Sequence, residues 1–266
     1  MTQGITYVEI GITDRERSLE FYRGLLGFAP VPAPGPELPG THWLAAGPAR
    51  IKLVEVADGA GLGGWIGDDL QRGIRHVGLK VGDVPRQAER LHAAGVPFTV
   101  EPVQAVGDVR LAFFTDPDGT LLEIIDGNLT YHHVLTPELA ERERQAALGR
   151  PADAAPIFDH VAVTVADLDA TLAYYRDSLG CRVIGQLVHS QDPRGFLITY
   201  LQAGDAVLEV FTFTADTQEN PWVDGDGRRG FRGVGLRSGG VRLVDPDGIP
   251  LQADDDPARA DGDRRE

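Results

Sequence analysis

The sequence predicts an α+β fold built from four βαβββ modules, the fourth of them truncated. Three observations support this prediction: one strand pattern recurs along the chain, amphipathic helices follow it, and hairpins with glycine-containing turns close the copies. A pattern that recurs in this way is typical of one supersecondary unit used several times.

The opening strand of the module is the clearest repeat. In its three intact copies the side chains alternate between two faces, and the copy ends in an aspartate that can cap a helix. These copies are ITYVEIGITD (5–14), IRHVGLKVGD (74–83) and FDHVAVTVAD (158–167), and FRGVGLRSGG (231–240) is a degraded fourth copy.

Short helices are predicted after the first strands. Apolar residues recur at helical spacing from Leu19 to Leu26 and from Leu168 to Leu179. Glycine then stands where a left-handed cap would end each helix, at Gly27, Gly95 and Gly180.

Each intact module closes with β-type segments, and a turn that contains glycine joins the last two strands. These segments end in HWLAAGPARIKLVEV, LAFFTDPDGTLLEII and ITYLQAGDAVLEVFTF. The fourth copy keeps the hairpin VRLVDPDGIPLQ but lacks the residues for a helix and a second strand. It is therefore predicted to be a remnant.

The length of 266 residues favours two small domains over one large one. We expect a first domain at 1–130, with modules at 4–56 and 73–126, and a second domain at 157–254, with modules at 157–213 and 231–254. A linker at 131–156 includes TPELAERERQAALGR, which can form a solvated helix, and the charged tail at 255–266 is predicted to be disordered.

Composition excludes several classes of protein. The formal charge of −15 would repel a nucleic-acid backbone and an anionic membrane, so we expect neither as a partner. The sequence shows neither a secretory signal nor an apolar run long enough to span a bilayer, and we expect a cytoplasmic location. Because Cys181 is the only cysteine, any metal must bind to His, Asp, Glu or Gln.

The helix segments SLEFYRGLLGF and TLAYYRDSLGC, together with FFTDPDGTLLEI at a module end, resemble the vicinal oxygen chelate superfamily. This superfamily includes glyoxalase I, epimerases, extradiol dioxygenases and the bleomycin and fosfomycin resistance proteins. The resemblance extends to about Gln252 and is specific for fold but weak for reaction. It implies that modules pair into two incomplete β-barrels, and that metal ligands come from the first and last strand of each partner.

Applied to this chain, the resemblance implies one set of metal ligands. Tyr7, His76, His160 and Gly233 are equivalent on the first strands, and Lys52, Glu123, Glu209 and Gln252 are equivalent on the last strands. Only modules two and three thus carry a His and a Glu, which are separated by 47 residues in one and 49 in the other. Such a set suits one divalent ion: Ni, Zn, Fe, Mn or Co.

Two pairings of the modules remain open. If module two pairs with module three, as in the fused glyoxalases that the chain resembles, His76, Glu123, His160 and Glu209 form one site. If neighbours along the chain pair, each barrel holds a poorer site of three ligands, completed by Glu9 in the first barrel and by Gln252 in the second. Taken singly, a strand histidine is more often a hydrogen-bonded core residue than a ligand.

Three functions follow from these alternatives, each with a small-molecule ligand and with a monomer or homodimer as the active form. The first is a metal-dependent lyase, isomerase or epimerase that resembles glyoxalase I, with Glu123 or Glu209 as the catalytic base. The second is an Fe(II) extradiol-type dioxygenase that cleaves an aromatic ring. The third is a non-catalytic resistance protein that binds a drug without metal.

Four further residues are candidates for a substrate pocket. Lys80 and Thr164 lie four residues beyond the two histidines, so they share the inward face, although they can equally lie at the wet end of the strand. Trp65 and Trp222 occupy matching glycine-rich segments and can either cover a pocket or anchor a loop.

Overall fold

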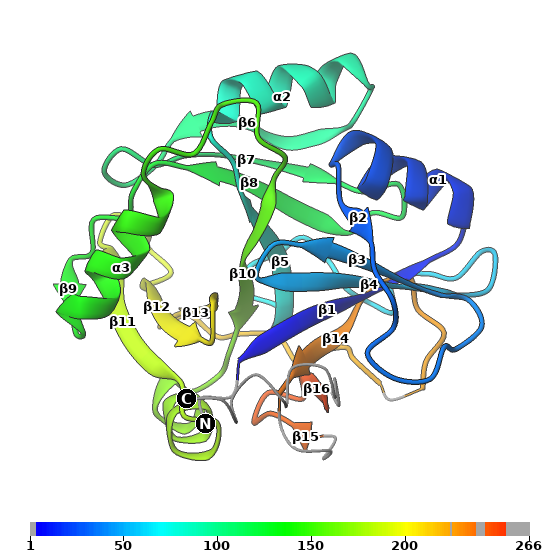
Figure 1. Cartoon of the computed structure of the whole chain (residues 1–266). Coiled ribbons are helices and arrows are strands. Elements are labelled where there is room, and N and C mark those ends of the chain that lie inside the picture. The colour runs from blue at the N-terminus through cyan, green and yellow to red at the C-terminus, as the bar shows by residue number, and fades with distance from the viewer. Residues whose placement is uncertain (1–3, 224, 238–242, 254–266) are drawn as a thin grey trace, which may run out of the picture.

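The computed structural model describes residues 4–223, 225–237 and 243–253, and the tail predicted to be disordered at 255–266 lies outside these residues. Its strands form two sheets, and short helices lie on their outer sides (Figure 1). The prediction of an α+β fold is confirmed. Within the described residues neither sheet closes into a barrel, as expected for incomplete barrels.

The first sheet has seven strands, built from modules one and four. Their order is β15 (Leu243–Val244), β16 (Pro250–Ala253), β14 (Gly230–Leu236), β1 (Ile5–Ile12), β4 (Ala49–Glu55), β3 (Thr41–Ala46) and β2 (Ala29–Pro30).

The second sheet has nine strands, built from modules two and three with one short strand between them. Their order is β6 (Phe98–Gln104), β7 (Arg110–Thr115), β8 (Leu121–Asp126), β5 (Gly73–Lys80), β10 (Ile157–Thr164), β13 (Ala206–Thr212), β12 (Phe196–Ala203), β11 (Arg182–His189) and β9 (His133–Val134).

The first strands of the modules form the centre of each sheet. β5 pairs antiparallel with β10, and β1 pairs antiparallel with β14. The closing strand of a module then lies parallel to its own first strand, as β8 does beside β5 and β13 beside β10. Module two therefore lies beside module three, and module one beside module four. The boundaries of the two domains stay a prediction.

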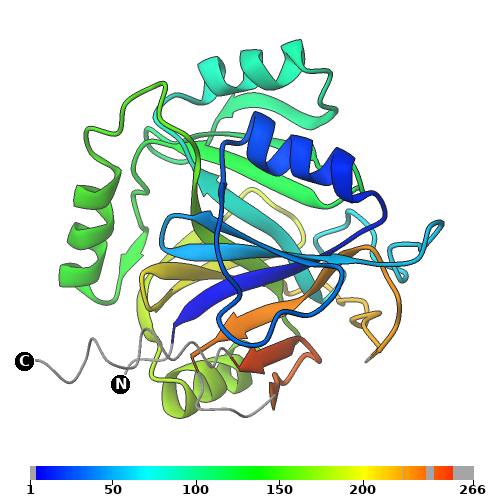
Figure 2. The same cartoon turned by 45° about the vertical axis from the view of Figure 1, so that its right-hand side comes forward.

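Three of the helices begin at an aspartate that caps the first turn. The helices are α1 (Arg15–Leu19), continued by the π-helical η1 (Glu20–Leu25), α2 (Val84–Ala93), α3 (Pro137–Ala147), and α4 (Leu168–Leu172), continued by the π-helical η2 (Ala173–Ser178). The side chains of Asp14, Asp83 and Asp167 each accept a hydrogen bond from a backbone N–H in the first turn. In both views α1 and α2 lie next to each other, and α3 lies on another side of the molecule (Figures 1 and 2).

Hydrogen bonds between helices and turns connect modules in a second way. The Tyr22 hydroxyl donates to Asp116 Oδ2 at 2.8 Å, and the Tyr175 hydroxyl donates to Asp245 Oδ2 at 2.9 Å. The two aspartates open the DPDG turns of modules two and four. Strand pairing thus joins module one to module four and module two to module three. The tyrosine–aspartate hydrogen bonds join module one to module two and module three to module four.

One apolar core extends across both sheets. It contains buried residues from β1, β4, β5, β8, β10, β13 and β14 and from the helices α2 and η1. A smaller cluster on the nine-stranded sheet includes Leu139 of α3 together with Leu187, Ile198 and Tyr200. No helix of the described residues is both long and apolar enough to cross a membrane.

Candidate metal centre

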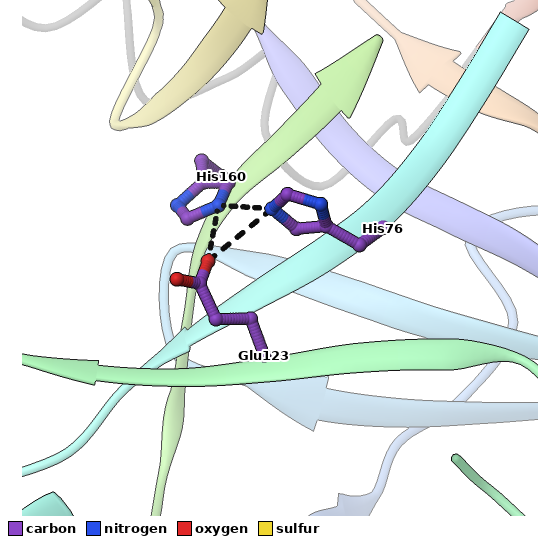
Figure 3. A group of neighbouring side chains, drawn as sticks. All are labelled: His76, Glu123 and His160. Atoms are coloured by element: carbon purple, nitrogen blue, oxygen red, sulfur yellow. Dashed lines mark hydrogen bonds and ion pairs between the residues drawn. The ribbon is translucent and has the colours of Figure 1, made fainter. Parts of the chain in front are cut away.

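Four side chains from four strands meet at the centre of the nine-stranded sheet. One ligand atom each from His76 on β5, Glu123 on β8 and His160 on β10 lies within 4.8 Å of the others. Figure 3 shows the two imidazole rings turned toward each other, with the carboxylate of Glu123 pointing at both. Glu209 on β13 approaches the same two rings from module three.

The distances between the donor atoms are short and similar. His76 Nε2 lies 3.0 Å from His160 Nε2, 3.2 Å from Glu123 Oε2 and 3.4 Å from Glu209 Oε2. His160 Nε2 lies 2.9 Å from Glu123 Oε2 and 3.3 Å from Glu209 Oε2. The structure therefore brings all four predicted ligands together.

Strand register explains this convergence. Along β5 and β10 every second residue faces the same side of the sheet. His76 pairs with Ala162, so His160 is displaced by two residues along the neighbouring strand and faces the same side as His76. Gly78 lies beneath the His160 ring, where a Cβ atom would come within 2.0 Å of His160 Cε1. Because Gly78 has no side chain, the imidazole ring of His160 can lie over this position.

The four side chains of the cluster are buried, and their charges act on one another. His76, Glu123 and His160 are each 3% exposed, and Glu209 is 7% exposed. Burial alone would lower the pKa of both imidazoles, but the neighbouring glutamates outweigh it and raise the pKa of each. Burial would raise the pKa of Glu123, whereas the two histidines lower it. Two buried carboxylates require nearby positive charge, and either imidazolium groups or a metal ion can provide it.

The donor set fits a divalent metal ion. With metal–ligand distances of about 2.0–2.2 Å, neighbouring donors in a tetrahedral or octahedral shell stand about 2.9–3.5 Å apart. The distance between the two histidine nitrogens and the four distances from them to the glutamate oxygens fall in this range. Asp159 Oδ2 also lies 2.9 Å from His160 Nδ1, which leaves Nε2 of that ring as the ligating atom.

The two glutamates have different partners on the neighbouring strands. Tyr200 on β12 pairs with Glu209 across the two strands, and burial and the nearby Glu209 carboxylate raise the pKa of its hydroxyl group. The equivalent position opposite Glu123 is Phe113 on β7, whose ring packs 5.0 Å from that of His76. The site is therefore symmetric in its ligands but asymmetric around them.

A small pocket opens beside the cluster. His160 and Glu209 line it, and α3 covers it with Ala140, Glu143 and Arg144. Its cavity volume of about 20 Å³ has room for roughly one water molecule. Glu143 accepts a hydrogen bond from Tyr131, and burial raises the pKa of this carboxyl group to about 7. The helix α3 thus limits access to the candidate metal centre.

The four residues predicted for a substrate pocket lie at different places. Lys80 lines this pocket and donates to the carbonyl oxygen of Gly127 at 2.9 Å. Thr164 is fully buried and donates to the carbonyl oxygen of Asp69. Trp65 packs against the core and donates to the carbonyl oxygen of Ile74, and Trp222 is half-buried in the segment that precedes β14.

Sequence reasoning missed Tyr200, Asp159 and Glu143. A usable signal existed for Tyr200, because the turn between Ala203 and Ala206 fixes the hairpin register and counting back places Tyr200 opposite Glu209. Asp159 and Glu143 carried no comparable signal, since their positions depend on a local side-chain rotamer and on the docking of α3.

Comparisons with known proteins agree with the fold. The family model of the Glyoxalase/Bleomycin resistance protein/Dioxygenase superfamily matches residues 4–124 and 157–236. The chain belongs to this superfamily.

Particular relatives share the glyoxalase I fold. Lactoylglutathione lyase GLX1 from Arabidopsis thaliana is 24% identical over 222 residues, which cover 80% of this chain and 68% of the relative. The crystal structure of glyoxalase I from Zea mays matches with a TM-score of 0.68 and 19% identity, covering 97% of this chain and 95% of that one. A putative dioxygenase from Bacillus subtilis matches with a TM-score of 0.55 and 19% identity, covering 93% of this chain and 72% of that one.

Proposed function

We propose that this chain is a metal-dependent lyase of the glyoxalase I type, which moves a proton on a carbon next to a carbonyl group. The observation that carries this proposal is the convergence of His76, Glu123, His160 and Glu209 within 3.4 Å contacts. These residues are the proposed ligands of one divalent ion. The name of the Arabidopsis relative, lactoylglutathione lyase, suggests the hemithioacetal of glutathione as the substrate.

When bound, a divalent ion would act as a Lewis acid toward the vicinal oxygens of the substrate. The remaining steps belong to side chains of this chain. A base must take the proton from the carbon beside the carbonyl and return it to the neighbouring carbon. A glutamate that lies at the edge of the cluster and faces the pocket suits this task.

Glu209 is the better candidate for the base. It lines the pocket beside the cluster, and its carboxylate lies 3.3–3.4 Å from the histidine nitrogens, whereas Glu123 lies 2.9–3.2 Å from them. The hydroxyl of the buried Tyr200 lies near the Glu209 carboxylate and can orient it. Glu123 then stays with the two histidines and keeps the cluster assembled.

Lys80 contributes charge to the proposed substrate pocket. Its ammonium group lies in the wall near Glu209 and is held by the carbonyl oxygen of Gly127. A glutathione conjugate carries carboxylates, which an ammonium group attracts. Lys80 is therefore proposed to orient the conjugate rather than to take part in proton transfer.

Metal content and turnover test the proposal together. Protein purified without chelators is expected to hold a stoichiometric divalent metal and to convert the hemithioacetal to lactoylglutathione. His76→Ala should lose both properties, and Glu209→Gln should lose the turnover. The matched control is His42→Ala, which removes an imidazole that pairs with Glu55 on the other sheet and should change neither property. Wild-type protein without metal binding would disprove the proposal.

A ring-cleaving dioxygenase is the second candidate, because two histidines and one glutamate, the set His76, Glu123 and His160, are also the ligands of extradiol enzymes. Oxygen uptake separates the two functions. Consumption of O₂ with a catechol, and no conversion of the hemithioacetal under anaerobic conditions, would favour the dioxygenase.

A further inference from the structure

The seven-stranded sheet has a second pocket at the place that corresponds to the candidate metal centre. On that sheet β1 pairs with β4 so that Glu9 faces Lys52, and on the other sheet β5 pairs with β8 so that Gly78 faces Glu123. The strand pairs β1–β4 and β5–β8 therefore have the same register. Lys52 therefore occupies the position that Glu123 has in the metal centre, and Tyr7 occupies the position of a histidine.

The packing beneath the two sites is also the same. The Tyr7 ring covers Gly235, where a Cβ atom would come within 2.1 Å of the ring, just as the His160 ring covers Gly78. Gly233 stands where the other sheet has its second histidine, so one side chain is missing. This pocket of about 260 Å³ lies above Tyr7 and Lys52.

The chemistry of the pocket is the reverse of that in the metal centre. Lys52 and Gln252 replace the two glutamates, so an ammonium and an uncharged amide stand in place of two carboxylates. Lys52 Nζ lies 2.7 Å from Glu9 Oε2, and Arg232 Nε lies 2.9 Å from Glu9 Oε1. Two cations thus share one carboxylate.

A local excess of positive charge follows. The nearby carboxylate of Asp226 is held by Arg228 at 2.7 Å, so this pair adds no net charge. The group of Lys52, Arg232 and Glu9 then carries one positive charge in a chain whose formal charge is −15. Lys52 is the member of this group that lines the pocket, and its positive charge there favours an anion.

The walls of the pocket are aromatic and apolar. The rings of Tyr7 and Trp43 meet edge to face with centroids 4.8 Å apart, and Lys52 Nζ lies 5.5 Å from both centroids. The Tyr7 hydroxyl donates to Gln252 Oε1 at 3.0 Å. Residues 33–36 and Leu38 form the rim. The volume is close to the lower end for small-molecule sites, about 300 Å³.

From these features we infer that the pocket binds a small organic anion, a carboxylate with a flat apolar body, independently of the metal centre. The carboxylate lies toward Lys52 and Gln252, and the flat body lies against Trp43. Benzoate is a suitable probe because it has this composition and is small enough for the volume.

Binding is measured by NMR through the indole N–H signal of Trp43. Benzoate is expected to shift this signal in a saturable manner at millimolar concentrations, and benzamide, its uncharged analogue, should bind at least about ten-fold more weakly, a difference of about 1.4 kcal/mol. Lys52→Gln should weaken benzoate binding to a similar extent, whereas Lys52→Arg should retain it. Lys80→Gln, which removes an ammonium from the other pocket, is the matched control and should bind benzoate like the wild type.

Two further variants keep the test decisive. Gln252→Glu introduces a negative charge and leaves Lys52 in place, so it should abolish binding even if Lys52→Gln fails to fold. His76→Ala should bind benzoate normally, which separates this inference from the proposed function. No saturable shift of the Trp43 signal, or equal affinity for benzamide, would overturn the inference.

Discussion

Tyr200 lies opposite Glu209 on the neighbouring strand with its hydroxyl near that carboxylate, while Phe113 holds the equivalent place opposite Glu123. This asymmetry distinguishes two glutamates that are otherwise equivalent by sequence. It also leads to the first prediction.

Tyr200→Phe should retain the metal but lower kcat about ten-fold with little change in KM. The variant removes the hydroxyl that can donate to the Glu209 carboxylate, and one hydrogen bond to a charged group contributes about 1.5 kcal/mol. Metal analysis and steady-state kinetics measure the two effects. Tyr174→Phe, which removes a hydroxyl from η2, is the control and should leave both unchanged. Loss of metal in Tyr200→Phe would mean that Tyr200 assembles the site instead of orienting the base.

A pair of glycines separates metal binding from folding. Gly78→Ala places a methyl group against the His160 ring, and Gly235→Ala places one against the Tyr7 ring. Both variants should lose about 1–3 kcal/mol of stability, as expected for overpacking. Only Gly78→Ala should lose metal, which a thermal melt with and without added metal detects. Equal metal affinity in the two variants would contradict the assignment of His160 as a ligand.

Stability should depend on the ionisation of Asp116. Burial raises the pKa of this carboxyl group to about 6 from an ordinary value of 3.8. The folded state thus binds the proton of Asp116 more tightly than the unfolded state does. The protonated carboxyl group therefore contributes to the free energy of unfolding in full below pH 3.8, and this contribution is lost as the pH rises through 6. Asp116→Asn should remove this loss, about 3 kcal/mol between pH 4 and 7.

Urea unfolding at several pH values measures this effect. The amide of the variant can donate to the Tyr22 hydroxyl, which keeps the contact between helix and turn. Asp14→Asn, at an exposed helix cap, serves as the control. If the free energy of unfolding of Asp116→Asn and of the wild type varied identically with pH, ionisation of Asp116 would not destabilise the folded protein.

The helix α3 should open to admit substrate, since the cavity that it covers holds only about 20 Å³. Leu139 is the buried residue that anchors this helix. Leu139→Ala should weaken the docking of α3 by about 2–3 kcal/mol. Hydrogen exchange at 137–147 should then accelerate, while exchange in β5 and β10 stays slow. Ala140→Ser is the control, and uniform acceleration in all strands would indicate global destabilisation instead.

Much of the fold and the four residues of the candidate metal centre could be predicted from the sequence. The alternation of side chains along ITYVEIGITD and its copies defines first strands, and the family resemblance transfers ligand positions onto His76, Glu123, His160 and Glu209. The convergence of these residues depends on β5 lying beside β10. Pairing between strands distant in the chain leaves no local signal, so the sequence allowed both module pairings.

The surroundings of the site were harder to predict for a similar reason. Glu143 reaches the pocket because α3 docks through Leu139 onto the nine-stranded sheet. The solvated helix expected at this segment gave no indication of where it would lie. Tertiary packing, rather than helix propensity, decides that position.

The hydrogen bonds from Tyr22 to Asp116 and from Tyr175 to Asp245 close the four modules into a ring. The ring has two equivalent seams, which are the strand pair β1–β14 in one sheet and β5–β10 in the other. Two identical half-length chains could form the same ring, but any substitution would then appear at both seams. A single chain encodes each seam separately. The seam in the nine-stranded sheet can keep donors for a cation while the seam in the seven-stranded sheet acquires Tyr7 and Lys52. The two pockets can therefore differ in function without a change in the shared scaffold.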